Sequence, residues 1–138
     1  MSDMFFNSFK EYMADGTIDL DSHTFKALLL TDAYTPDATD TVVADLSGEV
    51  ANGNGYTTGG VVLANVTWNR SGGTVTFDAD DPVWTSATFT ARYLVIYDDT
   101  PTSPADPLLL LKDFGANKSV TGGTFTVEFD ASGIFTLS

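Results

Sequence analysis

The stretch ATFTARYLVIYDD, residues 87–99, predicts a strand in the middle of a β-rich protein. Alternate residues of a strand point to opposite faces of its sheet. One face of this strand is expected to carry Phe89, Ala91, Tyr93, Val95 and Tyr97, while Leu94 and Ile96 lie on the other. Because both faces are apolar towards the end, we expect the strand to lie between two layers of structure.

Further strands are predicted on both sides of this stretch. A glycine-containing turn, NRSGG, separates VVLANVTW (61–68) from TVTFDA (74–79), and this arrangement predicts a β-hairpin. In the first of these strands, one face is expected to carry Val62, Ala64, Val66 and Trp68. The remaining predicted strands cover 17–21, 23–31, 107–115 and 123–138, the last with a break at 131–133. Together they predict an all-β fold, an antiparallel β-sandwich of the jelly-roll-like or Ig-like kind.

The first residues predict one short N-terminal α-helix. Apolar side chains recur there at spacings of three and four, namely Phe5, Phe6, Phe9, Tyr12 and Met13. Ser2 or Asp3 can cap the helix start and Gly16 suits its end. The apolar face either covers the protein's own sheet or docks on a partner, so Phe5, Phe6 and Phe9 are candidate interface residues. The length of 138 residues predicts a single domain, with the helix over 1–16 and the sandwich over 17–138.

The charge and cysteine content exclude several functions. Nineteen acidic residues against six basic ones give a formal charge of -13, and no basic stripe interleaved with aromatic residues is present, so a nucleic-acid partner is not expected. The acids are scattered, as on a solvated surface, although an acidic patch for a basic partner is the alternative. There is no cysteine, no secretory signal pattern and no apolar run long enough to cross a membrane, so we expect a protein made in the cytoplasm without membrane contact.

The densest group of acids lies in DADDPVW, residues 78–84. Asp78, Asp80 and Asp81 are candidate calcium ligands, because hard cations prefer several oxygen ligands. However, the segment lacks the spacing of a calcium-binding loop, and Pro82 and Trp84 are typical of a bend that ends one strand and returns the chain to the core. The bend is the favoured interpretation, so we predict no metal site.

No catalytic arrangement is evident in the sequence. His23 is the only histidine and is expected to be a surface or hydrogen-bonded residue rather than a base. The neighbouring acids of 78–81 are expected to point outwards and stay ionised rather than share a proton as a glycosidase pair would. We therefore predict no enzymatic activity and no cofactor.

The glycine-rich segment ANGNGYTTGG, residues 51–60, lacks the lysine and the following helix of a phosphate-binding loop. Its glycines are expected to allow positive φ angles in a tight loop. That loop would place Tyr56 against the core or against a partner, so Tyr56 is a fourth candidate interface residue.

Four stretches, taken together and in this order, carry a resemblance to a known group. They are FKALLLTDAYTPD, NGNGYTTGGVVLANVTW, DADDPVWTSATFTARYLVIYDDT and LLLLKDFGANKSVTGGTFTVEFDASGIFTLS. Over most of residues 24–138 the chain resembles small structural proteins of tailed bacteriophages.

The resemblance implies a virion protein with a β-sandwich body, and in particular a capsid decoration or cement protein on the outer surface of the shell. The expected partners are the major capsid protein and further copies of the chain, in a homo-oligomer such as a trimer or dimer. The alternatives are a tail, neck or fibre subunit, and a calcium-dependent or carbohydrate-binding β-sandwich that adheres to host surfaces.

Overall fold

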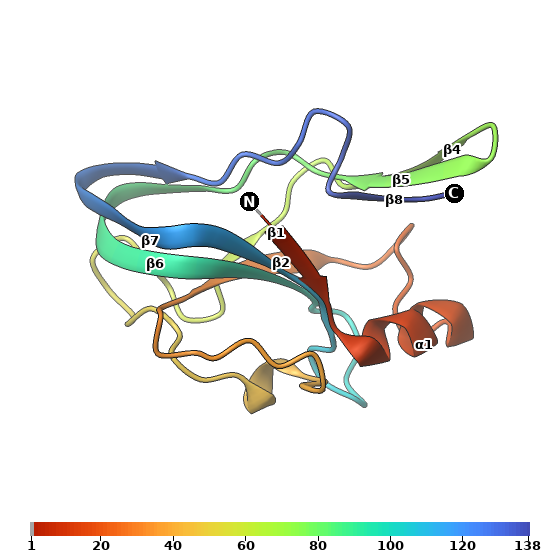
Figure 1. Ribbon diagram of the computed structural model, residues 1–138, viewed down its shortest axis with the longest axis horizontal. Coiled ribbons are helices and arrows are strands. Elements are labelled where there is room, and N and C mark those ends of the chain that lie inside the picture. The colour runs from red at the N-terminus through yellow and green to blue at the C-terminus, as the bar shows by residue number, and fades with distance from the viewer. Residues whose placement is uncertain (1) are drawn as a thin grey trace.

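Two antiparallel sheets and one α-helix make up most of the regular structure of residues 2–138, which the computed structural model describes (Figure 1). The larger sheet has the strand order β1-β7-β6-β2-β3, and the smaller has the order β4-β5-β8. The strands of the larger sheet are β1 (Ser2–Phe5), β7 (Leu108–Thr126), β6 (Val83–Asp98), β2 (Phe25–Leu30) and β3 (Val61–Val62). Those of the smaller are β4 (Thr67–Ser71), β5 (Thr74–Asp78) and β8 (Phe135–Leu137). The predicted antiparallel β-sandwich with one short N-terminal helix is confirmed.

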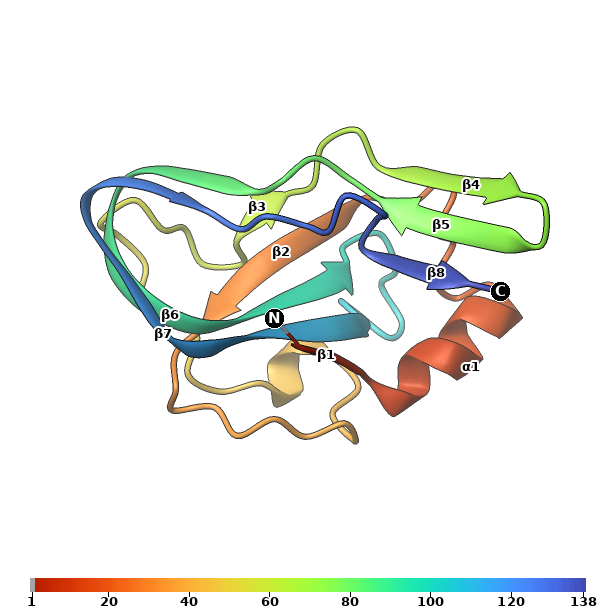
Figure 2. The same cartoon turned by 45° about the horizontal axis from the view of Figure 1, so that its top comes forward.

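The main core lies between the two sheets. Leu94 and Ile96 of β6 meet Phe77 of β5 and Phe135 of β8 in one cluster of buried side chains. A second cluster lies on the opposite face of the large sheet, where Tyr93, Val95 and Tyr97 pack with Tyr34 and Phe6. The 31–49 segment, which includes the short 3₁₀ helix η1 (Val43–Asp45), passes below this second face (Figure 2). The prediction that both faces of the 87–99 strand are buried is therefore confirmed for its second half.

The alternation in β6 shifts by one residue near its middle, which the sequence pattern did not indicate. Ala91 belongs to the core between the sheets, whereas Tyr93 belongs to the second core. The pairing of β6 with β7 is irregular between these two residues, and such an irregularity moves the following side chains to the other face. Phe89 and Ala91 therefore do not share a face with Tyr93, Val95 and Tyr97, as the prediction had them.

The predicted hairpin is present as β4 and β5. Ser71 pairs with Thr74 around the two glycines of the turn, and Gly72 has a positive φ of 60°. The strand predicted over 61–68 is, however, two strands, because Val61–Val62 belongs to the large sheet and Thr67–Ser71 to the small one. Between them Leu63 turns into the core and Asn65 has a positive φ, so the four residues predicted on one face do not share it.

The N-terminal prediction was wrong at its start. Residues 2–5 form β1, which pairs with β7, and α1 runs from Asn7 to Asp15. The extended backbone of Phe6 separates the two, so neither Ser2 nor Asp3 caps the helix. Gly16 ends the helix with a left-handed φ of 86°, as predicted. Met1, which the prediction included in the helix, lies outside the described residues.

Two further strand predictions were wrong. Residues 17–21 form a turn rather than a strand, because the Asp19 side chain accepts the backbone N–H of Asp21 and the hydroxyl of Ser22. The strand predicted over 107–115 and the first part of the one over 123–138 are a single strand, β7, that continues through the polar residues between them. The short final strand predicted after the break at 131–133 is present as β8.

Candidate interaction surface at the bend of the sheet

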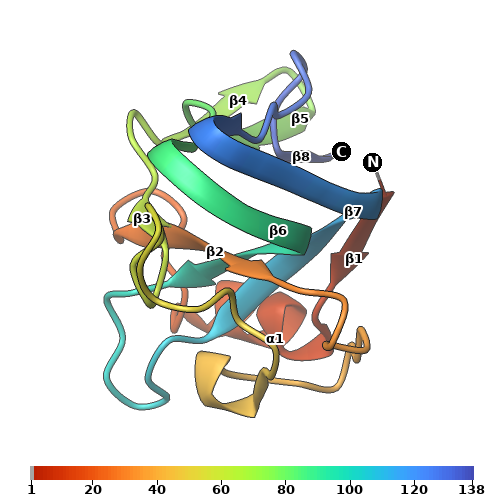
Figure 3. The same cartoon turned by 90° about the vertical axis from the view of Figure 1, so that its left-hand side faces the viewer.

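The long hairpin of β6 and β7 bends strongly on its way from one layer of the sandwich to the other (Figure 3). The second half of β6 and the first half of β7 lie beside β2 and β1, whereas their other halves lead to the small sheet. Their pairing is irregular at four points: extra residues lie in β6 between Trp84 and Ala87, and in β7 at the other three. Bulges of this kind increase the bend and twist of a strand. The curved part, which we call the bend, consists of residues 87–92 and 114–123.

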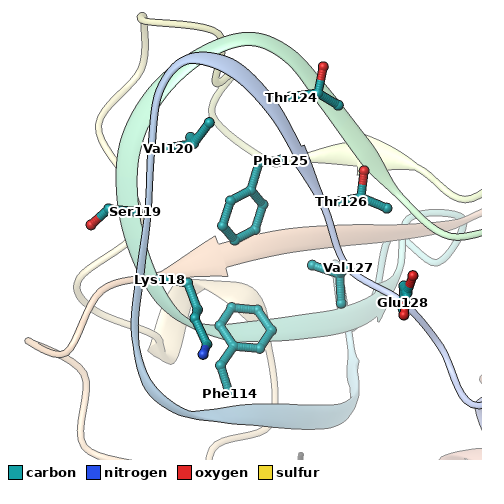
Figure 4. A pocket seen from close by; sticks show the side chains of 9 residues that line it. All are labelled: Phe114, Lys118, Ser119, Val120, Thr124, Phe125, Thr126, Val127 and Glu128. Atoms are coloured by element: carbon teal, nitrogen blue, oxygen red, sulfur yellow. The ribbon is translucent and has the colours of Figure 1, made fainter.

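A groove lies between two arms of β7 at the bend (Figure 4). The first arm is residues 114–120. The second arm is residues 124–128, which begin inside β7 and continue past its end at Thr126. Phe114 of the first arm and Phe125 of the second meet inside the groove, with ring centroids 6.2 Å apart. Val120 and Val127 add apolar surface, and the cavity has a volume of about 510 Å³. The groove therefore opens the core to solvent at one side of the sandwich.

The outer edge of β7 is paired only over the first part of the strand. There, β1 pairs with Leu110 to Asp113. From Phe114 to Thr126, β6 is the only strand paired with β7 in the described part of the chain. An unpaired strand edge exposes backbone groups that can pair with another chain.

Acidic residues are absent from the three stretches that build the bend and its surroundings. Residues 50–66, 82–97 and 114–127 contain no Asp or Glu but include Arg92 and Lys118. The 51–60 loop packs against the bend, where the Thr88 N–H donates to the Asn54 carbonyl oxygen at 2.9 Å. The residues of the bend itself therefore carry no acid. The carboxylates that border it include Asp113, which pairs with Arg92, Asp32, which accepts the Asn117 side-chain amide at 3.0 Å, and Glu128 at the groove.

The border between the acidic part and the bend is marked by an ion pair. Arg92 Nε donates to Asp113 Oδ1 at 2.9 Å, and the Gly115 N–H donates to the same oxygen at 2.8 Å. The Arg92 guanidinium, followed by this backbone N–H, lowers the pKa of Asp113. These contacts fix the place where β7 leaves β1 and enters the bend.

Two charged residues lie at the groove itself, Lys118 on the first arm and Glu128 on the second. Both side chains are exposed. Within residues 2–138 neither forms an ion pair or a side-chain hydrogen bond. By contrast, Lys112 lines a neighbouring hollow together with Glu128, and its Nζ donates to Asp3 Oδ1 at 2.9 Å. Lys118 and Glu128 thus offer opposite charges on opposite sides of an apolar groove.

Tyr56, a predicted interface candidate, lies in the core of its own chain. Its side chain is 2% exposed and stacks beside Trp84. The hydroxyl donates to Glu49 Oε2 at 2.6 Å and accepts the Leu29 N–H at 3.1 Å. Burial, and then the Glu49 carboxylate, raise the pKa of Tyr56. Of the two places predicted for Tyr56, the structure shows the core, and the glycines around it do have positive φ angles.

The aromatic candidates near the N-terminus are also largely internal. Phe6 is 0% exposed and Phe9 is 2% exposed, while Phe5 is partly buried and packs on the same core. Phe9 meets Phe135 of β8 with ring centroids 5.6 Å apart. These side chains therefore cover one end of the protein's own sandwich. Phe6 and Phe9 have no free surface for a partner.

The three acids of the 78–81 bend serve separate partners. Asp78 accepts the Ala79 N–H, Asp80 accepts the Asn65 side-chain amide at 2.6 Å, and Asp81 accepts the Phe129 N–H at 2.9 Å. No group of three or more metal-ligating side chains is found in residues 2–138. The Asp80 and Asp81 carboxylates connect the turn between β5 and β6 to two neighbouring segments, so residues 78–81 do form the strand-ending turn that the sequence favoured.

His23 is hydrogen-bonded, as predicted. Its Nδ1 and Asp98 Oδ2 are hydrogen-bonded at 2.6 Å, and the Asp98 side chain is fully buried. Burial raises the pKa of Asp98, and the bond from His23 partly opposes this effect. The pair holds the 16–24 segment to the end of β6. The nearby Ser22 hydroxyl donates to Asp19 rather than to the imidazole, so the three side chains do not form a nucleophile-base-acid chain.

Sequence reasoning missed the groove, since Phe114, Lys118, Val120, Phe125 and Glu128 were not among the candidates. The signal that could have indicated the surface is the acid-free composition of 82–97 and 114–127 in a chain with a charge of -13. No helix among the described residues is long and apolar enough to cross a membrane. Comparison with models of protein families, with curated proteins and with solved structures finds no match.

Proposed function

We propose that this chain is a non-enzymatic structural protein of a tailed-bacteriophage virion, and that it decorates the outer surface of the capsid as a cement protein. The sequence resemblance over residues 24–138 supports the phage origin. The observation that carries the binding role is the bend, whose own residues include no acid although the chain has a net charge of -13.

The physical role of such a subunit is stabilisation by binding. A protein that binds the assembled shell and not its separate subunits shifts the assembly equilibrium towards the shell. The acid-free bend can approach another protein with little desolvation of charge, whereas the acidic remainder faces solution and repels nucleic acid. The proposed partners are the major capsid protein and further copies of the chain, which is made in the host cytoplasm and ends on the virion surface.

Cryo-electron microscopy of the virion that contains this chain tests its position. Density on the outer surface of the shell, with the 51–60 loop and the β6 side of the bend (87–92) towards the capsid protein, is the expected result. Density only in the tail, neck or fibres would contradict decoration and support the alternative role as a subunit of those structures.

A pair of alanine substitutions tests the contact face. Ala51 is exposed in the 51–60 loop, which packs against the bend outside the two arms of the groove, and Ala105 is exposed in the acidic loop between β6 and β7. Ala51→Glu and Ala105→Glu change the net charge equally. We expect A51E to weaken binding to undecorated capsids at least about tenfold, because an unpaired charge at an interface is costly, and A105E to bind as the wild type does. Equal affinities of the two variants would exclude the loop side of the bend as the contact face.

A further inference from the structure

We propose that two copies of this chain contact each other through the groove of β7. A two-fold axis relates the copies, and it runs along the groove, midway between the two arms. The inference rests on the proposed function only in that a subunit of an assembly needs contacts with its neighbours.

The edge beside this groove is the longest that the structure leaves unpaired in residues 2–138. The outer side of β7 is unpaired over residues 114–126, whereas β3 has two residues, β8 three, β1 four and β4 five. The edge of β1 is also less suitable for a contact between copies, because β1 carries Asp3 and lies beside Asp113. Two chains with a charge of -13 each repel one another, so a contact between copies is most favourable where carboxylates are few. The 114–127 stretch contains none.

The apolar part of the groove fits a protein partner rather than water. Phe114 and Val120 are half-buried in the single chain, and Phe125 and Val127 lie behind them. Aromatic residues in the centre of a contact commonly supply most of its binding energy. A second copy that placed its own arms over the groove would complete the burial of Phe114 and Val120 in both chains at once.

The charges at the groove identify the partner as a copy of the chain. A two-fold contact is self-complementary, so residue i of one copy meets residue j of the other, and j meets i. With the axis along the groove, the first arm of each copy lies against the second arm of the other. In the single chain Lys118 and Glu128 lie on the two sides of the groove (Figure 4). In the paired arrangement Lys118 of each copy would therefore face Glu128 of the other. One symmetric contact thus pairs two charges that have no partner within the described chain.

Charge reversal gives a sharp test of this arrangement. In K118E, position 118 of one copy and position 128 of the other are both acidic, and in E128K both are basic. Each variant alone is therefore expected to be a monomer. An equimolar mixture of the two is expected to form a mixed dimer, because every 118–128 pair across the axis again joins opposite charges. The double variant K118E/E128K is expected to form a dimer by itself for the same reason.

Sedimentation equilibrium over a range of protein concentrations measures the dissociation constant of each species. The single variants are expected to raise it at least about tenfold, and the mixture and the double variant to restore most of the loss. Thermal melts check that each variant is folded. The variants K10E and E11K make the same charge changes on the exposed side of α1 and are expected to pair as the wild type does.

A wild-type chain that stays monomeric at about 100 µM, two single variants that pair normally, or a mixture that fails to pair would each overturn the inference. Binding to capsids is measured separately on the same proteins. Monomeric single variants that still bind shells would leave the decoration function intact, whereas a wild-type dimer that binds no shell would overturn the function and not the pairing.

Discussion

Two tyrosine hydroxyl groups, those of Tyr56 and Tyr97, join the 51–60 loop to the large sheet. The Tyr56 hydroxyl bonds both Glu49 and the Leu29 N–H, and Glu49 also accepts the Gly59 N–H at 2.7 Å. The Tyr97 hydroxyl donates to the Gly59 carbonyl oxygen at 2.6 Å. The loop that packs against the bend is therefore positioned by polar contacts inside the protein, and its order depends on them.

Removal of the Tyr56 hydroxyl is expected to be costly. In Tyr56→Phe the buried Leu29 N–H and the Glu49 carboxylate each lose a partner, so the free energy of unfolding should fall by about 1–3 kcal/mol. Urea denaturation measures the change. Tyr12→Phe is the matched control, because Tyr12 is partly exposed on α1, and it should stay within about 0.5 kcal/mol of the wild type. Equal effects of the two substitutions would contradict the role given to Tyr56.

Alanine substitutions at Gly60 and Gly53 distinguish the energetic cost of backbone strain from that of steric overlap. Both have positive φ angles, 82° and 108°. A Cβ at Gly53 would meet nothing within 4 Å, whereas one at Gly60 would overlap the Ala27 carbonyl group of β2. We expect Gly53→Ala to cost about 1–2 kcal/mol from its backbone conformation alone. Gly60→Ala should cost about 3 kcal/mol more or prevent folding, as measured by thermal or urea denaturation. If the two variants were equally stable, the close approach of Gly60 to β2 would be wrong.

At the scale of elements, α1 closes one end of the sandwich through its aromatic residues. Phe5 and Phe9 stack with ring centroids 6.0 Å apart, and both meet the edge of Phe135. The helix lies beside β8 and the start of β7 in Figures 1 and 2. The N-terminal segment is thus part of the fold rather than an appended docking helix.

This role predicts a large effect of Phe9→Ala. Loss of a buried phenylalanine leaves a cavity against Phe135, so the free energy of unfolding should fall by about 3–5 kcal/mol. Lys10→Ala, at an exposed neighbouring position, should change it by no more than about 0.5 kcal/mol. Chemical denaturation measures both values. A Phe9→Ala protein as stable as Lys10→Ala would contradict the packing of α1 on the core.

Elements specified by local sequence were the ones that could be predicted. The β4–β5 hairpin depends on a two-glycine turn between alternating strands, and the end of α1 depends on Gly16, so neighbouring residues contain the necessary information. β1 could not be predicted in the same way. Phe5, Phe6 and Phe9 have helical spacing, and only the distant β7 gives residues 2–5 a strand to pair with.

The candidate site was hidden for a related reason. Gly115, Asn117 and Gly122 interrupt the apolar alternation of β7, so the sequence suggested two strands with a loop between them. In the structure Gly115 and Gly122 have positive φ angles where the strand curves, and the curve brings Phe114 to Phe125. Contacts across a bend depend on where the bulges fall, and a period of two residues contains no information about them.

For the whole molecule, the acidic residues determine how stability depends on pH. Hydrogen bonds with neighbouring side chains and backbone N–H groups lower the pKa values of Asp15, Asp19, Asp37, Asp45 and Asp130, and the Arg92 guanidinium lowers that of Asp113. Their contribution to stability is present above the unfolded value of about 4 and is lost as the pH falls through the lower folded values. Burial raises the pKa values of Asp98 and Asp106, so their contribution is present at low pH and is lost as the pH rises through the raised folded values.

These opposite signs predict a maximum of the melting temperature at mildly acidic pH, between about 4 and 6. Below it the hydrogen-bonded carboxylates become protonated. Above it Asp98 and Asp106 ionise, and the self-repulsion of a chain with a charge of -13 increases. Thermal melts from pH 3 to pH 8 measure the profile. Salt should reduce the decline on the alkaline side, because it screens exposed charges. A melting temperature that rises steadily up to pH 8 would contradict this account.

The pairing of β1 with β7 has a consequence for the order in which the molecule is made. Asp3 and Lys112, which are bonded in the finished sheet, lie 109 residues apart in sequence. A ribosome releases the N-terminus first, so Met4, Phe5 and Phe6 emerge long before the strand that covers them. β7 becomes available only after the residues between the two strands, and β7 itself, have been synthesised. The large sheet is therefore expected to close late, and until then its first strand is an apolar segment that chaperones would meet.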